Sequence, residues 1–179
     1  MPDFTYHEMF PLEEDTTAYR VLTTEHVGLE KFNGTDILTV EGEGLTKLAA
    51  QAFYDSAHFL RPGHLKQLAS ILDDKDASPN DHFVVWDLLK NANIAAGGIL
   101  PMCQDTGTAI VMGKKGSRVW TVGGDENYIA KGIEKTYATD NLRFSQLAPL
   151  AMFEEKNTRS NLPAQIDLHH VDGNEYKFL

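Results

Sequence analysis

One short segment of the sequence concentrates residue types that can do chemistry. Residues 100–108 read LPMCQDTGT and place a thiol, a neutral amide and a carboxylate at the consecutive positions Cys103, Gln104 and Asp105. The segment lies between a predicted helix end and a predicted strand, where a rigid scaffold presents a loop. The sequence therefore offers this loop as its first candidate for a functional site.

The role of Cys103 has three interpretations. On composition alone, a small buried hydrophobe is favoured. A thiol nucleophile would need a histidine base nearby in space. A ligand to an iron–sulfur cluster would need partner thiolates, and the sequence contains one cysteine.

A second candidate is Arg143, in the run Asn141-Leu142-Arg143-Phe144-Ser145. It follows a predicted helix and precedes a long aperiodic stretch of about residues 145–163. A guanidinium in this neutral setting can clamp a carboxylate through two parallel hydrogen bonds. The alternative is a surface ion pair, for instance with Asp140.

Composition excludes several classes of protein. The 179 residues are 42% hydrophobic and carry a net charge of −10. This length favours one domain, and the acidic balance argues against nucleic-acid binding because phosphates would be repelled. There is no apolar run long enough for a membrane span, and we expect no secretory signal at the N-terminus. The single cysteine forbids an internal disulfide, so we expect a cytoplasmic location.

The elements that must position these residues indicate an α+β fold. Apolar spacing predicts helices between residues 43 and 97 and another after Gly124, with Ser78 and Pro79 starting the third. Strands are predicted at 19–22, 36–40, 164–171 and 175–179, with a hairpin of 108–112 and 118–122 whose tip carries Lys114, Lys115 and Arg118. We expect a helical N-terminal half packed on a small mixed or antiparallel sheet.

Two regions are expected within the chain: an acidic N-terminal extension with short strands over residues 1–42, and the main body over 43–179. The last predicted strand is still apolar at Leu179, so we expect the sequence to be a piece of a longer protein. The predicted core comprises Leu48, Phe53, Leu68, Ile71, Val85, Leu88, Leu89, Ile110, Val111, Trp120, Ile129, Ile133, Ile166 and Leu168.

Five segments together resemble the N-terminal part of class I fumarate hydratase, the iron–sulfur type, in that family's order and spacing. They are residues 100–109 (LPMCQDTGTA), 113–116 (GKKG), 118–121 (RVWT), 140–143 (DNLR) and 161–167 (NLPAQID). The resemblance runs from Pro11 to the last residue.

The resemblance implies an enzyme of the tricarboxylic acid cycle that interconverts fumarate and (S)-malate on a [4Fe–4S] cluster held by three cysteines. Cys103 matches the first of these metal ligands. Gln104 and Asp105 match substrate-contacting residues, Asp105 also being catalytic, and Arg143 matches the arginine that holds a substrate carboxylate. We therefore expect these four residues to converge on one solvent-open face.

The resemblance also implies what this chain lacks. The other two cluster cysteines and a C-terminal domain belong to the rest of the polypeptide, and the complete enzyme is expected to be a homodimer. We expect no cluster and no activity in the 179-residue chain alone. The alternatives are the α part of a tartrate-type dehydratase and a non-catalytic binding module that retains the fold.

Overall fold

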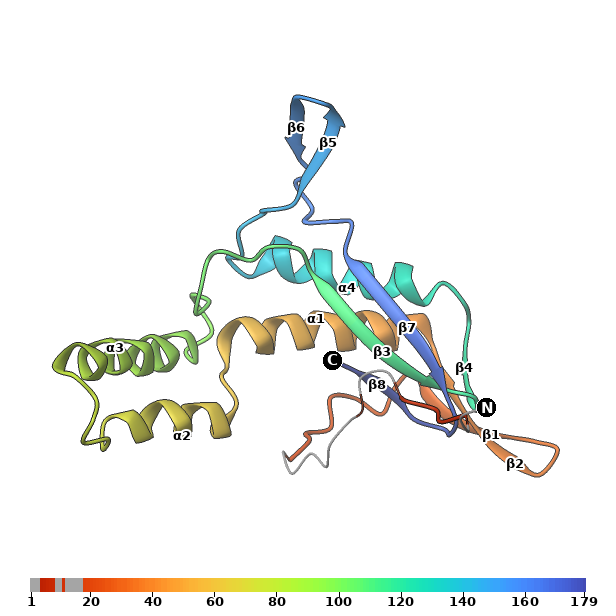
Figure 1. Ribbon diagram of the computed structural model, residues 1–179. Helices are drawn as coiled ribbons and strands as arrows, with labels where there is room; N and C mark the ends of the chain where they lie inside the picture. Colours follow the sequence, from red (N-terminus) through yellow and green to blue (C-terminus); the bar gives the residue numbers. More distant parts are fainter. Residues whose placement is uncertain (1–3, 9–10, 12–17) are drawn as a thin grey trace.

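The computed structural model describes residues 4–8, 11 and 18–179, which form the α+β fold predicted from the sequence (Figure 1). Of the acidic run at residues 11–15, only Pro11 lies among the described residues. The division of the chain at residues 42 and 43 stays a prediction. The helices are α1 (Gly42–His58), α2 (Pro62–Ile71), α3 (Pro79–Ala95) and α4 (Asp125–Thr139). The strands are β1 (Val27–Phe32), β2 (Thr35–Val40), β3 (Ile110–Gly116), β4 (Val119–Thr121), β5 (Leu147–Ala151), β6 (Glu154–Asn157), β7 (Gln165–Val171) and β8 (Tyr176–Phe178).

Helices α1 and α4 lie side by side and form the centre of the core (Figure 1). Their backbones approach closely at Gly132, where an added Cβ would lie 2.4 Å from the carbonyl oxygen of Thr46. The hydroxyl of Thr136 donates a hydrogen bond across the contact to the carbonyl of Ala50, at 2.8 Å. Small residues on this stripe therefore set the distance between the two helices.

Helices α2 and α3 form a hairpin that extends away from the sheets (Figure 1). The start of α3 is as predicted: the Ser78 side chain accepts from the amide of Asp81, and the Asp81 carboxylate accepts from the amide of Ser78, with Pro79 in the first turn. The hydrogen bonds with Ser78 hold the pKa of the Asp81 carboxyl below its usual value. A capping box thus fixes where α3 begins.

The predicted hairpin of 108–112 with 118–122 is wrong. Strand β3 is the centre of a mixed sheet, parallel to β7 and antiparallel to β8, whereas β4 pairs in parallel with β2 in a second sheet of order β1-β2-β4. Gly116 serves a close approach rather than a turn, because an added Cβ would lie 2.5 Å from the carbonyl oxygen of Gly173. The strands at 164–171 and 175–179 both exist, but they flank β3 instead of pairing with each other.

The basic residues predicted at a hairpin tip lie at least partly inside the structure: Lys114 is buried, and Lys115 and Arg118 are partly buried. Lys114 is paired with Glu8. Lys115 donates to Thr121 at 2.7 Å and to Asp125 at 2.9 Å, and the hydroxyl of Tyr176 also donates to Asp125 at 2.9 Å. This group of four side chains, the Asp125 cluster, ties β3, β4, β8 and the first turn of α4 together.

Several strand predictions differ from the structure. Residues 19–22 form no strand, while β1 and the β5–β6 hairpin were not predicted. Every residue of β1 and of β6 is exposed, so neither strand has the alternation of buried and exposed residues that marks a strand in sequence. Figure 1 shows the β5–β6 hairpin projecting beyond the sheets.

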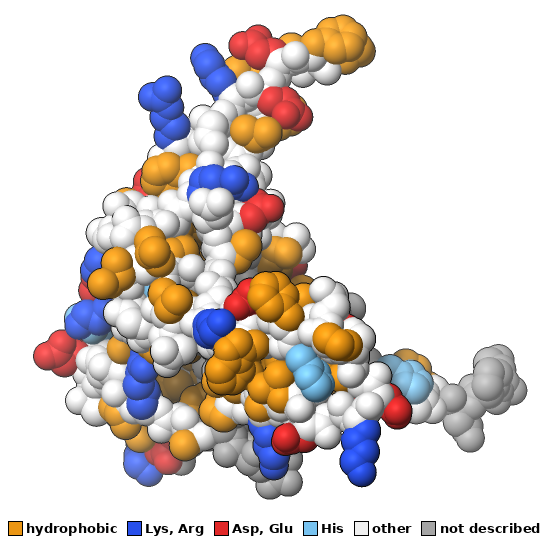
Figure 2. All heavy atoms as spheres, turned by 90° about the vertical axis from the view of Figure 1, so that its left-hand side faces the viewer, with side chains coloured by type: hydrophobic (Ala, Val, Ile, Leu, Met, Phe, Trp, Pro, Cys, Tyr) orange, Lys and Arg blue, Asp and Glu red, His pale blue; other side chains and the backbone are white. Residues whose placement is uncertain are grey.

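The predicted core is partly confirmed. Val85, Val111, Ile129 and Ile133 are buried, and Phe53, Leu68, Ile71, Leu89, Ile166 and Leu168 are partly buried. Four predicted core residues are exposed instead: Leu48, Leu88, Ile110 and Trp120. Figure 2, which looks toward the α2–α3 end of the molecule, shows hydrophobic side chains gathered on the surface there.

Candidate active site

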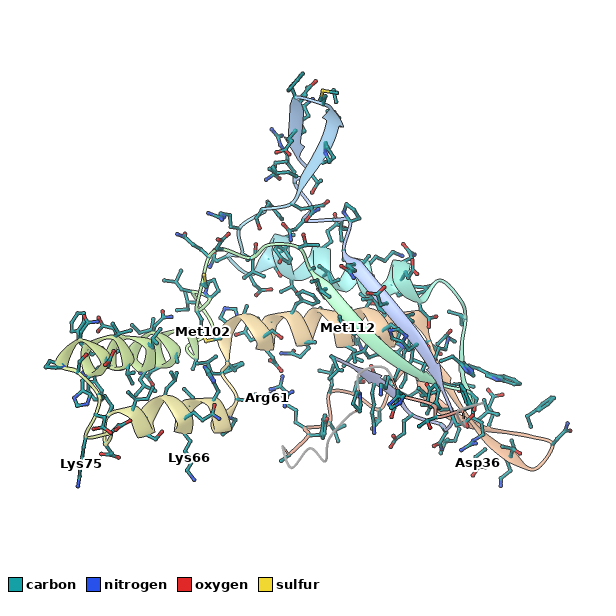
Figure 3. The ribbon with its side chains drawn as sticks, viewed as in Figure 1. Asp36, Arg61, Lys66, Lys75, Met102 and Met112 are labelled. Carbon is teal, nitrogen blue, oxygen red and sulfur yellow. The ribbon has the colours of Figure 1, made fainter. Side chains whose placement is uncertain are left out.

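The loop that carries Cys103 is anchored immediately before that residue. The amide of Met102 donates to the carbonyl of Ala57 at the end of α1, at 2.9 Å, and the Asn91 side chain on α3 donates to the carbonyl of Met102, at 2.8 Å. Figure 3 labels Met102 where the loop passes between these helices. The Asn141 side chain also donates to the carbonyl of Ile99 at 2.9 Å. Hydrogen bonds with α1, α3 and the segment after α4 therefore fix the position of the loop just before Cys103.

Cys103 itself is exposed, so the interpretation as a small buried hydrophobe is wrong. Its sulfur accepts a hydrogen bond from the amide of Asp105 at 3.4 Å. Cys103, Gln104 and Asp105 all lie on the exposed surface of the loop. An accessible thiol is the form in which cysteine acts as a ligand or nucleophile rather than as a packing residue.

Arg143 lies beside this loop. Its Nη2 donates to Oδ1 of Asp105 at 2.5 Å, although the two residues are 38 positions apart in the sequence. The partner is thus Asp105 and not the neighbouring Asp140, whose carboxylate accepts from Thr139. Both side chains remain accessible, with 53% of Arg143 and 74% of Asp105 exposed. The structure therefore brings a thiol, a carboxylate and a guanidinium to one open face.

Two hydroxyls hold the Arg143 segment against the loop. Oγ1 of Thr106 donates to the backbone carbonyl of Arg143 at 2.6 Å and lies 2.6 Å from the hydroxyl of Ser145. Neither Thr106 nor Ser145 was assigned a role from the sequence. Their role is positional, because they fix the backbone from which the guanidinium extends.

Asn161 is the buried residue that completes the site scaffold, and sequence reasoning did not assign it. Its Oδ1 accepts from the amides of Ser145 and Gln146, at 2.8 and 2.9 Å, and its Nδ2 donates to the carbonyl of Gly107 at 3.1 Å. Asn161 is 0% exposed and has a φ of 56°, a conformation that asparagine tolerates better than most residues. The one available signal was its membership of a family-like segment.

An iron–sulfur cluster that needs three thiolate ligands does not fit this chain by itself. The sequence contains one cysteine, and within the described residues no three His, Cys, Asp or Glu side chains gather closely enough to hold a metal ion. The exposed thiol of Cys103 is suited to be one ligand of such a group, provided that the others come from elsewhere.

The helices were also compared with what a membrane span requires. In the part of the chain that the structure describes, none is both long enough and apolar enough to cross a bilayer.

Comparison with known proteins gives a consistent result along the chain. The family described as "Fumarate hydratase (Fumerase)" matches residues 46–179. "Fumarate hydratase class I, aerobic" of Escherichia coli (strain K12) is 58% identical over 98% of this chain and 32% of its own length. "Fumarate hydratase class I, anaerobic" of the same strain is 57% identical over 98% of this chain and 32% of its own length.

A more distant organism gives the same match. "Fumarate hydratase 2" of Leishmania major is 54% identical over 82% of this chain and 26% of its own length. The chain thus spans about a third of the length of the curated relatives that it matches.

Proposed function

Because the chain belongs to the fumarate hydratase family, we propose that it forms the N-terminal part of a class I fumarate hydratase, a hydro-lyase that reversibly adds water to fumarate to give (S)-malate. The observation that carries the proposal is the 58% identity with a class I relative over nearly the whole chain. The grouping of Cys103, Asp105 and Arg143 on one open face supports it, since a four-carbon dicarboxylate spans only a few ångströms.

Arg143 holds one substrate carboxylate in this proposal. A guanidinium carries five N–H donors in a planar fork, and the contact with Asp105 occupies one nitrogen. The same side chain can therefore orient Asp105 and bind a carboxylate at once. Fixing the substrate in this way determines which face of the double bond receives water.

Asp105 handles the proton, and Gln104 contacts the substrate through its amide. Adding water across a double bond delivers a hydroxyl to one carbon and a proton to its neighbour, so a group that transfers protons must lie within reach of the substrate. The ion pair with Arg143 holds the Asp105 carboxylate in one direction, while its exposure leaves it accessible to a ligand on the open face.

The proposal includes a [4Fe–4S] cluster in the complete enzyme, with Cys103 as one of three thiolate ligands and the other two in the remainder of the polypeptide. When bound, such a cluster supplies a Lewis acid for the substrate's oxygen atoms. The contribution of this chain is to present the Cys103 thiol beside Asp105 from an anchored loop. We further propose that the complete enzyme is a cytoplasmic homodimer acting in the tricarboxylic acid cycle.

The direct test is an assay of the complete protein, isolated without oxygen, with fumarate, (S)-malate and tartrate as separate substrates. We expect turnover of fumarate and malate, and loss of that turnover in Cys103→Ala. Lys66→Ala is the matched control, because Lys66 lies on α2 and points away from the body of the molecule (Figure 3). Turnover of tartrate alone would replace the proposal with a tartrate-type dehydratase.

A further inference from the structure

One edge of β3 is only partly paired. Met112 and Leu179 exchange two backbone hydrogen bonds, at 3.1 and 2.7 Å, and the amide of Gly116 donates to the carbonyl of Glu175 at 2.9 Å. Even-numbered residues of β3 therefore bond toward β8, and the alternation of a strand turns the amide and carbonyl of Ile110 toward the same edge. Within the described residues, Ile110 pairs with Gln165 on β7 but has no strand partner on this edge.

An apolar groove of about 230 Å³ lies along the same edge, between α1 and the sheet. It is lined by Leu48, Ala52 and Phe53 of α1, by Ile110 of β3, and by Phe178 and Leu179. Leu48 and Ile110 are two of the predicted core residues that the structure leaves exposed, at 38% and 51%. Leu48, which faces the groove from α1, becomes a core residue if the groove is filled.

The chemistry of the groove favours a strand over a small molecule. Its volume is below the roughly 300–1,000 Å³ of ligand pockets, and its lining is almost entirely apolar. A strand would fill the groove with its side chains and would hydrogen-bond the amide and carbonyl of Ile110. The relatives are about three times as long as this chain, and Leu179 is both the last residue paired to β3 and part of the groove wall.

We propose that the three residues following Leu179 in the longer polypeptide continue β8 along β3 and fill this groove. The proposal rests on the proposed function only in that it requires the longer protein. The register is fixed by the observed pairing of Gly113 with Phe178 and of Lys115 with Tyr176. The first residue after Leu179 then pairs with Val111, the second with Ile110 and the third with Ala109.

The same register states which side chains enter the groove. Directly opposed residues point to the same face of a sheet, and Phe178, Val111 and Ala109 pack on the core side. The first and third residues after Leu179 therefore face α1 and are apolar, while the second points away with Ile110. The continued strand runs toward Gly107, so the polypeptide after it arrives at the loop of Asp105.

A pair of engineered cysteines in the complete protein tests the register. Met112 and Leu179 are a hydrogen-bonded pair, so Val111 and the first following residue are a non-hydrogen-bonded pair with Cα atoms about 4.5 Å apart, within disulfide range. We expect Val111→Cys, combined with a cysteine at that first position, to form a disulfide in most molecules after oxidation by glutathione disulfide. Mass spectrometry of the digested protein identifies the linked peptides.

The matched control moves the second cysteine by one residue. With Val111→Cys retained and the cysteine at the second position, the two side chains lie on opposite faces and we expect no link. Linkage of this shifted pair would overturn the register, and absence of linkage in both pairs would overturn the strand. Fumarate turnover is measured separately, on the unsubstituted protein. If that protein is inactive but the cysteine variant forms the expected disulfide, the proposed function is refuted and this inference stands.

Hydrogen exchange of the unsubstituted complete protein gives a second measurement that needs no variant. We expect the amide of Ile110 to be as protected as that of Met112. Exchange of Ile110 as fast as that of the exposed strand β1 would overturn the proposal.

Discussion

At the scale of single residues, the ion pair of Arg143 and Asp105 joins two exposed side chains. Exposed pairs of this kind contribute about 0–1 kcal/mol to stability, because solvent screens the charges and ordering the side chains costs entropy. The pair therefore adds little to the stability of the fold, and its main effect is to orient the side chains of Arg143 and Asp105. In the proposed function, a substrate carboxylate can therefore bind the guanidinium without destabilising the fold.

We predict that Arg143→Ala in the complete enzyme lowers kcat/KM for fumarate and malate, with a loss of transition-state stabilisation of about 2–4 kcal/mol. The reason is that the desolvated contact between the substrate carboxylate and the guanidinium loses one partner. This loss corresponds to roughly 30-fold to 1,000-fold. Arg143→Lys should recover only part of the loss, since an ammonium cannot form the bidentate fork. Steady-state kinetics beside Lys66→Ala measure both effects, and unchanged kcat/KM in both variants would remove Arg143 from the site.

Asn161 allows the side chain and the backbone conformation to be tested separately. Asn161→Gly keeps the positive φ accessible but removes three hydrogen bonds, so we predict faster hydrogen exchange at the amides of residues 145 and 146 and a loss of about 3–4 kcal/mol in unfolding free energy. Asn161→Ala should lose about 1 kcal/mol more, from the strain of a Cβ at this φ. Equal stability of the glycine variant and the parent protein would show that the three bonds contribute nothing.

At the scale of elements, the Asp125 cluster joins strands of both sheets to the start of α4. Burial raises the pKa of the Asp125 carboxyl, but hydrogen bonds from Thr121, Lys115 and Tyr176 together lower it by more. The net result is a pKa below its usual value. Burial, together with the Asp125 carboxylate, raises the pKa of the Tyr176 hydroxyl well above its usual value. Asp125 is therefore charged and Tyr176 neutral at physiological pH.

A lowered folded-state pKa gives Asp125 a stabilising effect that is complete above its unfolded pKa of about 3.9 and is lost as pH falls through the folded value. We predict that Asp125→Asn lowers the unfolding free energy by about 1–3 kcal/mol near pH 7 and that the deficit shrinks at pH values below about 4. Urea unfolding across this range measures it. Tyr176→Phe should be less stable than the parent and lose less of its stability as pH falls, because one of the hydrogen bonds that lower the Asp125 pKa is removed. A constant deficit in Asp125→Asn would contradict the linkage.

The helices could be predicted from the sequence because each has its own apolar period and, for α3, its own cap at Ser78. The pairing of strands could not, because neighbours in the sheet are distant in the sequence: β3 lies between β7 and β8, more than 50 residues further along the chain. At the candidate site, residue type was enough to single out Cys103 and Asp105, whose roles stay predictions. The contact of Asp105 with Arg143 and the role of Asn161 could not, since both depend on tertiary structure and a buried amide has no distinctive pattern.

At the scale of the whole molecule, apolar side chains remain exposed on two projecting elements. Phe83, Trp86 and Ile94 of α3 are 54–64% exposed, and Met152 and Phe153 at the tip of the β5–β6 hairpin are 88% and 95% exposed. Exposed apolar groups of this density are typical of surfaces that contact further protein. They agree with a chain that spans about a third of the length of its relatives.

We predict that the 179-residue chain alone neither retains a [4Fe–4S] cluster nor hydrates fumarate, because it supplies one thiolate where three are needed. Its remaining oxygen and nitrogen donors are poorly matched to iron–sulfur chemistry. Anaerobic reconstitution with ferrous iron and sulfide, followed by iron analysis, visible absorption and a malate assay, measures this. A stoichiometric cluster with turnover would refute the role given to Cys103.

The three hydrogen bonds of Asn161 also set the order in which the site can be completed during translation. Gly107 and Asn161 are separated by 54 positions, which a ribosome adds in about 3–11 s at about 5–20 residues per second. During that interval Cys103 has already been synthesised, but the side-chain amide that fixes the neighbouring backbone has not. The backbone beside Cys103 therefore acquires its final hydrogen bonds only after Asn161 has left the ribosome.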